Sequence, residues 1–354
     1  MGPPEMTQTT GWWPPAGSSV GAGVTPFQTD ADAAIRLAVD AEQRGYARFG
    51  TAEGWTHDAV VLLTQIAGVT SRIGLGTGVL PVWSRTPAAI AMAAAGLQRA
   101  SDGRFALGLG ASSPPLVEGL HGITWEQPLD RMRTTLVAVR ALLEGNRLPL
   151  EREHVRPLRL GAPPERRVPI LLAALAPASV RLAGELADHW LPFLWARSRL
   201  HDGRTLLAEG EALAEPRSPT GVTVSVPLAI AEDVETASKI AAGWLLAYLT
   251  RMGPLYPRML RDQFGFAHEV DALLGANANG GPPRLPTGAE RLARDVTVMG
   301  TYEEAPDTIR LWLEAGADAI DLVLPLGVPE GQLHEMLEAA APAARSSTSE
   351  QRPP

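Results

Sequence analysis

Short apolar segments alternate with longer amphipathic segments along most of this chain. The apolar segments are residues 19–27, 46–54, 72–82, 104–112, 168–175, 189–195, 221–231 and 319–325. The segments between them carry helix signals, such as Pro87 in the first turn of residues 86–101 and Gly45 near the end of residues 30–46. Strands that are apolar along nearly their whole length have both faces covered, as in parallel sheets. Eight such units in 354 residues predict an α/β fold of the TIM (β/α)8 barrel type, with insertions.

The two ends of the chain and one internal segment depart from this alternation. Residues 1–19 and 341–354 are rich in Pro, Gly, Ser and Thr, so we expect flexible tails on either side of a single domain that spans residues 20–340. Residues 253–290, between the seventh and eighth strands, form an irregular insertion. A long insertion at this place predicts a mobile lid over the mouth of the barrel.

Composition narrows the class of function. The net charge is -8 and no dense Lys/Arg cluster is present, which argues against nucleic acid or an anionic membrane as a partner. The chain has no cysteine, so it has no disulfide, thiolate metal site or cysteine nucleophile. No apolar run reaches membrane-spanning length, and no His/Asp/Glu cluster has metal-ligand spacing. We therefore expect a cytoplasmic protein that acts on a small molecule without a metal, and a homodimer is compatible with this sequence.

Glycines gather near the ends of the third and fourth predicted strands. Gly74, Gly76 and Gly78 alternate in the third strand, and Gly108 and Gly110 follow in the fourth. In a TIM barrel the carboxyl ends of the strands form the active-site face, so these glycines predict a flat ligand lying against the backbone. Tight packing within the barrel is the alternative explanation. Neither segment has the full spacing of the dinucleotide-binding fingerprint.

Chemically active side chains follow the second predicted strand. Glu53 would act as a general base or hydrogen-bond the edge of a ligand ring, unless it is a salt-bridged loop carboxylate. His57 is suited to relaying a proton near neutral pH, but it also lies beside Thr56 and Asp58, which are good helix N-caps. Trp55 would form a wall of the pocket.

Small and hydroxyl-bearing residues end the next strands. Ser112 and Ser113 end the fourth strand and are suited to hydrogen-bonding a ligand, although no hydrolase elbow motif surrounds them. Ala173 and Ala174 end the fifth strand, where small side chains again allow a ligand to approach the backbone.

Two further groups of side chains are candidates for the mouth of the barrel. The tryptophans Trp13, Trp55, Trp83 and Trp195 are candidate lining residues of an apolar pocket. Arg258, Arg261 and Arg284 lie in the insertion and are suited to attracting an acidic ligand tail, with solvated surface charge as the alternative.

The stretch from residue 51 to 122 resembles the bacterial luciferase-like family. Within it, "SDGRFALGLGAS" followed by "EGLHG" is most similar to the branch that uses the deazaflavin coenzyme F420. The segments "RLAGELADHWLPF" and "VTVMGTYEEAPDTIRLWLEAGADAIDLVLP" are also similar, so the resemblance covers roughly residues 20–340. The family fold is a TIM barrel with insertions, in agreement with the strand count.

The resemblance implies a flavin-type ring at the mouth of the barrel, backed by a non-prolyl cis peptide that maps onto Gly78-Val79. By resemblance the position of Glu53 touches the cofactor, and His121 recurs in the family pattern. Together with the residue arguments above, we predict Glu53 and His57 as catalytic residues and Trp55, Trp83, His121 and Trp195 as substrate-binding residues. From the strand ends and this cis peptide together, the predicted cofactor-binding residues are Gly76, Thr77, Gly78, Val79, Gly110, Ser112, Ser113, Ala173 and Ala174. Enzymes of this family that oxidise a sugar phosphate carry a glutamate acid near the end of strand four. Serine and proline stand there in this chain, which argues against that reaction.

Three functions remain open at this point. The first, favoured by the resemblance, is an oxidoreductase that transfers hydride between coenzyme F420 and a small organic substrate. The second is a monooxygenase that uses reduced FMN, supplied by a separate flavin reductase, together with oxygen. The third is a binding protein or lyase on the same fold without a cofactor.

Overall fold

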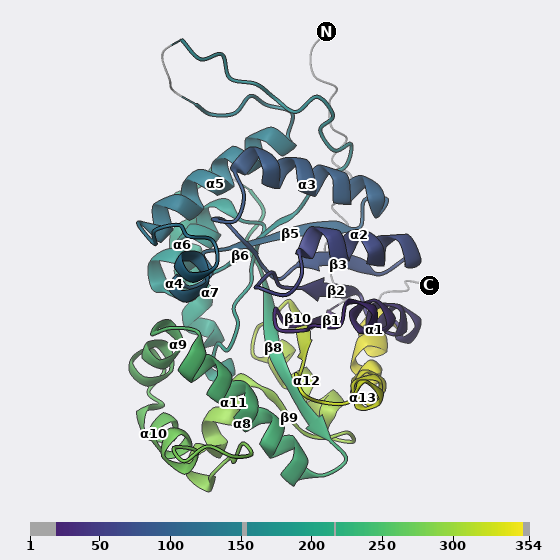
Figure 1. Cartoon of the computed structure of the whole chain (residues 1–354), viewed down its shortest axis with the longest axis vertical. Coiled ribbons are helices and arrows are strands. Elements are labelled where there is room, and N and C mark those ends of the chain that lie inside the picture. Colours follow the sequence, from purple (N-terminus) through teal and green to yellow (C-terminus); the bar gives the residue numbers. More distant parts are fainter. Residues whose placement is uncertain (1–18, 151–153, 216, 350–354) are drawn as a thin grey trace.

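The structure is a computed structural model that describes residues 19–150, 154–215 and 217–349, with side chains described up to residue 344 in the last helix. The predicted N-terminal tail, residues 1–19, lies outside the described residues except for Ser19, which is buried. Strands and helices alternate, and the helices surround a central sheet (Figure 1).

The strands are β1 Val20–Val24, β2 Arg48–Thr51, β3 Gly74–Thr77, β4 Leu80–Pro81, β5 Phe105–Gly110, β6 Ile170–Ala173, β7 His189–Trp190, β8 Gly221–Ala231, β9 Val298–Thr301 and β10 Ala319–Leu324. All of their pairings are parallel, in the order β10-β1-β2-β3-β5-β6-β7-β8, and β8 pairs back onto β10. This closure confirms the predicted TIM barrel. β4 continues the line of β3, whereas β9 pairs only with the second half of β8 and was missed from the sequence.

The helices are α1 Ala31–Arg44, α2 Ala59–Val69, α3 Pro87–Ala100, α4 Pro114–Gly119, α5 Pro128–Leu143, α6 Pro177–Leu186, α7 Leu200–Glu211, α8 Val234–Arg251, α9 Leu255–Arg258, α10 Ala267–Ala276, α11 Glu290–Val296, α12 Ala305–Glu314 and α13 Glu330–Ser349. Shorter turns are η1 Arg197–Arg199, η2 Met259–Gln263 and η3 Thr287–Ala289. None of the described helices is both long enough and apolar enough to cross a membrane.

Local sequence signals explain where the first helices begin and end. The Asp30 carboxylate accepts a hydrogen bond from the backbone N–H of Ala33 and so caps α1, which ends at Gly45 with a φ of 89°. Asp58 caps α2 in the same way, and Thr86 caps α3 ahead of Pro87. The cap of α2 is therefore Asp58 and not His57.

The insertion after α8 is more ordered than its sequence indicates. It contains α9, η2, α10 and η3, and it supplies side chains to the cavity described below. Residues 275–286 of the insertion are polar and rich in Gly and Pro, yet Asn277 holds them together. Its side-chain amide donates to the backbone oxygen of Arg284 (2.8 Å) and accepts from the backbone N–H of the same residue (2.9 Å). The mobility of this lid stays a prediction.

The last helix corrects the predicted C-terminal boundary. The residues assigned to a tail from position 341 onward continue α13 to Ser349, and Ala341 and Ala344 are buried. In Figure 1 α13 lies beside α1 and α12. The hydroxyl of Tyr46 donates to the backbone oxygen of Leu337 at 2.9 Å, which ties α13 to the barrel. The end of this helix was missed because Pro342, which lies inside it, and the Ser and Thr residues that follow are typical of a tail.

An ion pair lies inside the barrel. Arg48 is 2% exposed, and its guanidinium is 2.6 Å from the carboxylate of Asp321 on β10. It also donates to the backbone oxygens of Ser19 and Ile320. A Cβ atom on Gly21 would come within 2.2 Å of the Asp321 carboxylate, so glycine is needed beside the pair. The Arg48–Asp321 pair is therefore closely packed against the neighbouring strand, as apolar core side chains are.

His189 at the start of β7 is a buried titratable group. Its Nδ1 lies 3.1 Å from the Thr223 hydroxyl, and its ring lies where a Cβ on Gly221 would be. Burial is the main cause that lowers the pKa of His189 to about 4, and the nearby Arg48 charge adds to it. The imidazole of His189 is therefore neutral in the folded chain near neutral pH.

We expect this histidine to make the fold sensitive to acid. Because its pKa is lower in the folded chain than in the unfolded chain, its stabilising contribution is complete above about pH 6.5 and is lost as pH falls towards about 4. The loss is at most about 3 kcal/mol. Urea unfolding between these pH values should show a shallower pH dependence in His189→Gln. The exposed His201 gives a matched control, since His201→Gln should leave the slope unchanged.

Candidate active site

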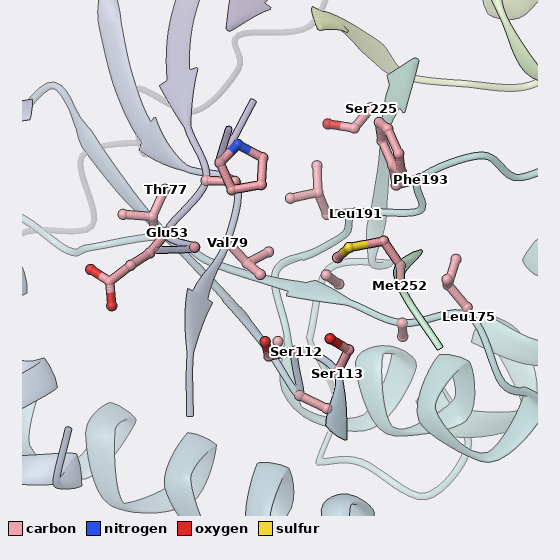
Figure 2. Close-up of a pocket in the computed structure, with 18 of the residues that line it drawn as sticks. Glu53, Thr77, Val79, Ser112, Ser113, Leu175, Leu191, Phe193, Ser225 and Met252 are labelled. Atoms are coloured by element: carbon pink, nitrogen blue, oxygen red, sulfur yellow. The ribbon is translucent and has the colours of Figure 1, made fainter. Parts of the chain in front are cut away.

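A cavity of about 560 Å³ lies at the carboxyl ends of the barrel strands. It is lined by the last residues of β1, β2, β3, β5 and β6, by the following loops, and by the α8–α9 segment. All nine residues that the sequence assigned to cofactor binding line this cavity: Gly76, Thr77, Gly78, Val79, Gly110, Ser112, Ser113, Ala173 and Ala174. Figure 2 shows Val79, Leu191, Phe193 and Met252 converging on it. The active-site face of the predicted barrel is therefore hollowed.

The third strand is interrupted at the cavity. The peptide bond between Gly78 and Val79 is cis, as predicted. The N–H of Gly78 donates to the backbone oxygen of Thr51 at 2.8 Å, and the N–H of Glu53 donates to that of Val79 at 2.9 Å. The end of β2 and the loop after it therefore hold both ends of this peptide, and Val79 lines the cavity.

The hydroxyl of Thr77 replaces a main-chain partner next to this interruption. It donates to the backbone oxygen of Gly108 and accepts from the backbone N–H of the same residue, both at 2.8 Å. Thr77 is 2% exposed, so water cannot take over these bonds.

The glycines at the strand ends differ in the space that a side chain would meet there. A Cβ on Gly78 would meet no atom within 4 Å, so this position opens onto the cavity. A Cβ on Gly108 would lie 1.9 Å from the backbone oxygen of Thr77, and one on Gly110 would lie 2.9 Å from the Val79 side chain. Ligand approach therefore fits Gly78. At Gly108 the backbone of Thr77 leaves no room for a side chain, so tight packing, the alternative explanation, applies there, and at Gly110 the Val79 side chain would have to shift.

Glu53 reaches the cavity wall, but its carboxylate is occupied. One oxygen accepts from the Ser84 hydroxyl (3.1 Å) and the Arg85 guanidinium (2.5 Å), and the other from Arg85 (3.0 Å) and the backbone N–H of Ala59 (3.1 Å). Figure 2 shows the carboxylate turned away from Phe193. The geometry matches the salt-bridged alternative, and a general-base role stays a prediction.

Arg85 joins this carboxylate to a second one. Its guanidinium also lies 2.5 Å from Asp58, the cap of α2. Burial alone would lower the pKa of Arg85, but the hydrogen bonds to Glu53 and the charges of Glu53 and Asp58 raise it above its usual value. Arg85 therefore stays charged, and the Glu53–Arg85–Asp58 network fixes the loop after β2 against the loop before α3.

His57 and His121 lie outside the main cavity. Both line a smaller polar pocket on the other side of Glu53, and the Nε2 atom of each is buried without a partner among the described residues. Trp55 borders both pockets and is 54% exposed. The structure thus brings His57 and His121 together, but it does not bring them to the cavity.

Two of the tryptophans predicted to line the pocket belong to the core, and that prediction was wrong. Trp83 is 6% exposed and faces Trp125 at 5.5 Å between ring centroids. Trp195 is 1% exposed and packs edge-on against Trp190 at 4.8 Å. Neither reaches the cavity, because both rings are used in packing between helices and strands. Trp13 lies outside the described residues.

Several cavity residues were missed from the sequence. They are Leu116, Trp125, Met132, Leu175, Leu191, Phe193, Tyr248, Met252, Leu255 and Tyr256. The last four flank the start of the insertion, so the predicted lid indicated the segment but not the side chains. Apolar residues carry no chemical signature that separates a cavity wall from a core position. Within the described residues, no group of three or more His, Asp or Glu side chains is arranged to hold a metal.

The loop after β5 offers free hydroxyl groups. Ser112 has a φ of 68°, in the left-handed region, and Ser113 is the N-cap residue of α4 without a capping bond from its side chain. Figure 2 shows both serines at one end of the cavity. Both line the cavity, and their role in binding a ligand stays a prediction.

Comparison with known proteins gives consistent matches. The model of the luciferase-like monooxygenase family matches residues 9–319. A Mycobacterium tuberculosis protein named as a coenzyme F420-dependent oxidoreductase is 30% identical over 319 residues, covering 83% of this chain and 90% of its own. The F420-dependent tetrahydromethanopterin reductase of Methanopyrus kandleri superposes with a TM-score of 0.71 at 19% identity, covering 90% and 97% of the two chains. The FMN complex of a Baeyer-Villiger monooxygenase from Pseudomonas putida superposes with a TM-score of 0.63 at 19% identity, covering 91% and 98%.

We expect alanine substitutions at Gly108 and Gly78 to distinguish a glycine required by strand packing from one that opens onto the cavity. Gly108→Ala should lower the free energy of unfolding by about 1–3 kcal/mol or more, because its Cβ would overlap the Thr77 backbone. Gly78→Ala should change it by less than about 1 kcal/mol, because its Cβ enters open space. Urea denaturation of both variants measures the difference. Equal losses would contradict the assignment of Gly78 to the cavity.

We also expect Glu53→Gln to destabilise the fold. The substitution leaves the half-buried Arg85 without its main counter-charge and should cost about 1–3 kcal/mol of unfolding free energy. Asp58→Asn, at the exposed partner, should cost about 1 kcal/mol or less. A general-base role would require Glu53→Gln to lower turnover about 10²–10⁴-fold more than Arg85→Met does.

Proposed function

The chain belongs to the luciferase-like monooxygenase family of oxidoreductases, and from this premise we propose that it transfers hydride between coenzyme F420 and a small organic substrate. The observation that carries the proposal is the cavity beside the Gly78-Val79 peptide, at the carboxyl ends of the strands. One side of it is backbone with small side chains, and the other side is an apolar wall.

This cavity fits a flat tricyclic ring. Gly78 leaves its backbone face open, and Ala173 and Ala174 project only methyl groups. Val79 would support the ring from behind, and the Ser112 and Ser113 hydroxyls are placed to bind polar atoms of the ring or its side chain. When bound, the deazaflavin would supply the hydride acceptor or donor, while these residues bind and orient it.

Arg258 favours the deazaflavin over FMN. Of the three arginines considered for an acidic tail, Arg261 is paired with Asp271 at 2.5 Å, and Arg284 does not line the cavity. Arg258 lines the cavity and is exposed, and among the described residues no carboxylate pairs with it. Coenzyme F420 continues beyond its first phosphate as an acidic tail, whereas FMN ends there. A free cation at the cavity rim suits the longer molecule.

The sequence relationship points the same way. The relative from Mycobacterium tuberculosis that is 30% identical is named for coenzyme F420. The likeness to the FMN-bound monooxygenase lies under 25% identity and therefore concerns the fold. An FMN-dependent monooxygenase served by a separate reductase is the competing function, and a protein without a cofactor is the third.

We expect the purified protein to bind coenzyme F420 more tightly than FMN. Fluorescence titration with each cofactor at one salt concentration measures the two dissociation constants. Arg258→Gln should weaken F420 binding about threefold to tenfold at low salt and less at high salt, because a rim charge is screened. Arg284→Gln is the matched control and should change neither constant.

The competing functions give different results in the same titration. Tenfold tighter binding of FMN, about 1.4 kcal/mol, would replace the proposal with the monooxygenase. Binding of neither cofactor at about millimolar concentration, a free energy near -4 kcal/mol or weaker, would favour a protein without a cofactor.

A further inference from the structure

We propose that the hydroxyl groups of Tyr248 and Tyr256 bind the oxygen of a ketone or secondary alcohol on an otherwise apolar substrate. This inference rests on the proposed function, because it assigns the substrate class of the same cavity. Both tyrosines line the cavity, Tyr248 from the last turn of α8 and Tyr256 from α9.

The two rings are held in fixed positions. Their centroids are 5.0 Å apart with an interplanar angle of 77°, an edge-to-face contact. Phe193 packs against both rings, at 4.8 Å from Tyr248 and 6.4 Å from Tyr256. The ring of Phe27, after β1, lies 6.2 Å from that of Tyr248, centroid to centroid. These ring contacts fix where the two hydroxyls lie in the cavity.

Neither hydroxyl is satisfied by the protein. Among the described residues no donor or acceptor pairs with Tyr248 or Tyr256, and burial raises the pKa of both phenols above the usual value. By contrast, the buried hydroxyl of Tyr46 donates to a backbone oxygen at 2.9 Å. Neither oxygen is among the buried side-chain atoms without a partner in the described part of the chain, so both hydroxyls are open to the cavity. A ligand oxygen placed there would accept their hydrogen bonds in place of water. Both phenols remain neutral donors at ordinary pH.

Apart from Arg258 at the rim, the charged groups that line the same cavity are already paired. Glu53 is bound by Arg85, and Asp321 is bound by Arg48. The hydroxyl of Thr77 is used by Gly108. These groups are therefore not available to a substrate, whereas the tyrosine hydroxyls are.

The surroundings of the tyrosines define the rest of the substrate. Leu175, Leu191, Phe193, Met252 and Leu255 line the cavity beside them, and none of these side chains can hydrogen-bond a polar substrate. A sugar or a polyol would leave hydroxyls unpaired against this wall. An apolar molecule with a single oxygen function satisfies both the wall and the two phenols.

The test compares two ligands of the same shape. 2-Octanone and 2-methyl-1-octene differ in having a C=O or a C=CH2 group, so only the ketone can accept a hydrogen bond. Intrinsic tryptophan fluorescence measures both dissociation constants for the full chain, with and without coenzyme F420. We expect the unsubstituted protein to bind the ketone at least about fivefold more tightly than the alkene.

Phenylalanine variants assign that preference to the hydroxyls. Tyr248→Phe and Tyr256→Phe should each reduce the preference, and the double variant should abolish it, with alkene binding unchanged. Tyr302→Phe is the matched control, because its hydroxyl bonds Glu335 on α13, away from the cavity. Thermal unfolding of each variant verifies that the fold is kept.

The remaining outcomes separate this inference from the proposed function. Equal binding of ketone and alkene, no ketone binding, or a preference that survives the double variant would each overturn the inference. Coenzyme F420 affinity, measured on the same variants, should not change. A tyrosine-dependent ketone preference without F420 binding would support the substrate assignment and overturn the proposed cofactor.

Discussion

The hydroxyl of Thr77 is the interaction on which the site depends. It occupies both the N–H and the oxygen of Gly108, where β3 and β5 would otherwise pair through main-chain groups. Gly108 must lack a side chain for this to happen, because its Cβ position coincides with the Thr77 backbone. Gly78, which follows Thr77 in the chain, begins the cis peptide that presents Val79 to the cavity. One buried hydroxyl and one glycine therefore determine where the strand stops and where a ring can lie.

The paired charged side chains around the cavity connect segments of the fold to one another. The Glu53–Arg85–Asp58 network joins the loops after β2 and before α3, and the Arg48–Asp321 pair joins β2 to β10. Buried charges that are paired and hydrogen-bonded in this way are costly to separate, so they are suited to structure. What remains for a ligand is mostly backbone, serine hydroxyls, phenols and apolar surface. That combination suits hydride transfer, which needs orientation and exclusion of water more than a charged group.

The sequence predictions were right where the position of a residue follows from the barrel topology, and wrong where it depends on packing between distant segments. The nine proposed cofactor-binding residues follow strand ends, and strand ends in a parallel barrel all meet at one face, so their placement follows from topology. The tryptophans do not follow that logic. Trp83 and Trp195 fill the core, while Tyr248 and Tyr256 reach the cavity from the α8–α9 segment. An aromatic side chain looks the same in a sequence whether its ring packs against a helix or faces a ligand.

The sequence by itself determined the closed barrel, because strand alternation and helix signals are local. The family and the position of the cis peptide followed from the resemblance of residues 51–122 to known members, not from those local signals. The sequence left open which polar groups are free. Glu53 could be a base or a salt-bridge partner until Arg85 was seen on it, and His57 could face the ligand until it was found in a separate pocket with His121. Only the tertiary structure decided these points, because whether a group is paired depends on residues distant in the chain that folding brings within hydrogen-bonding distance.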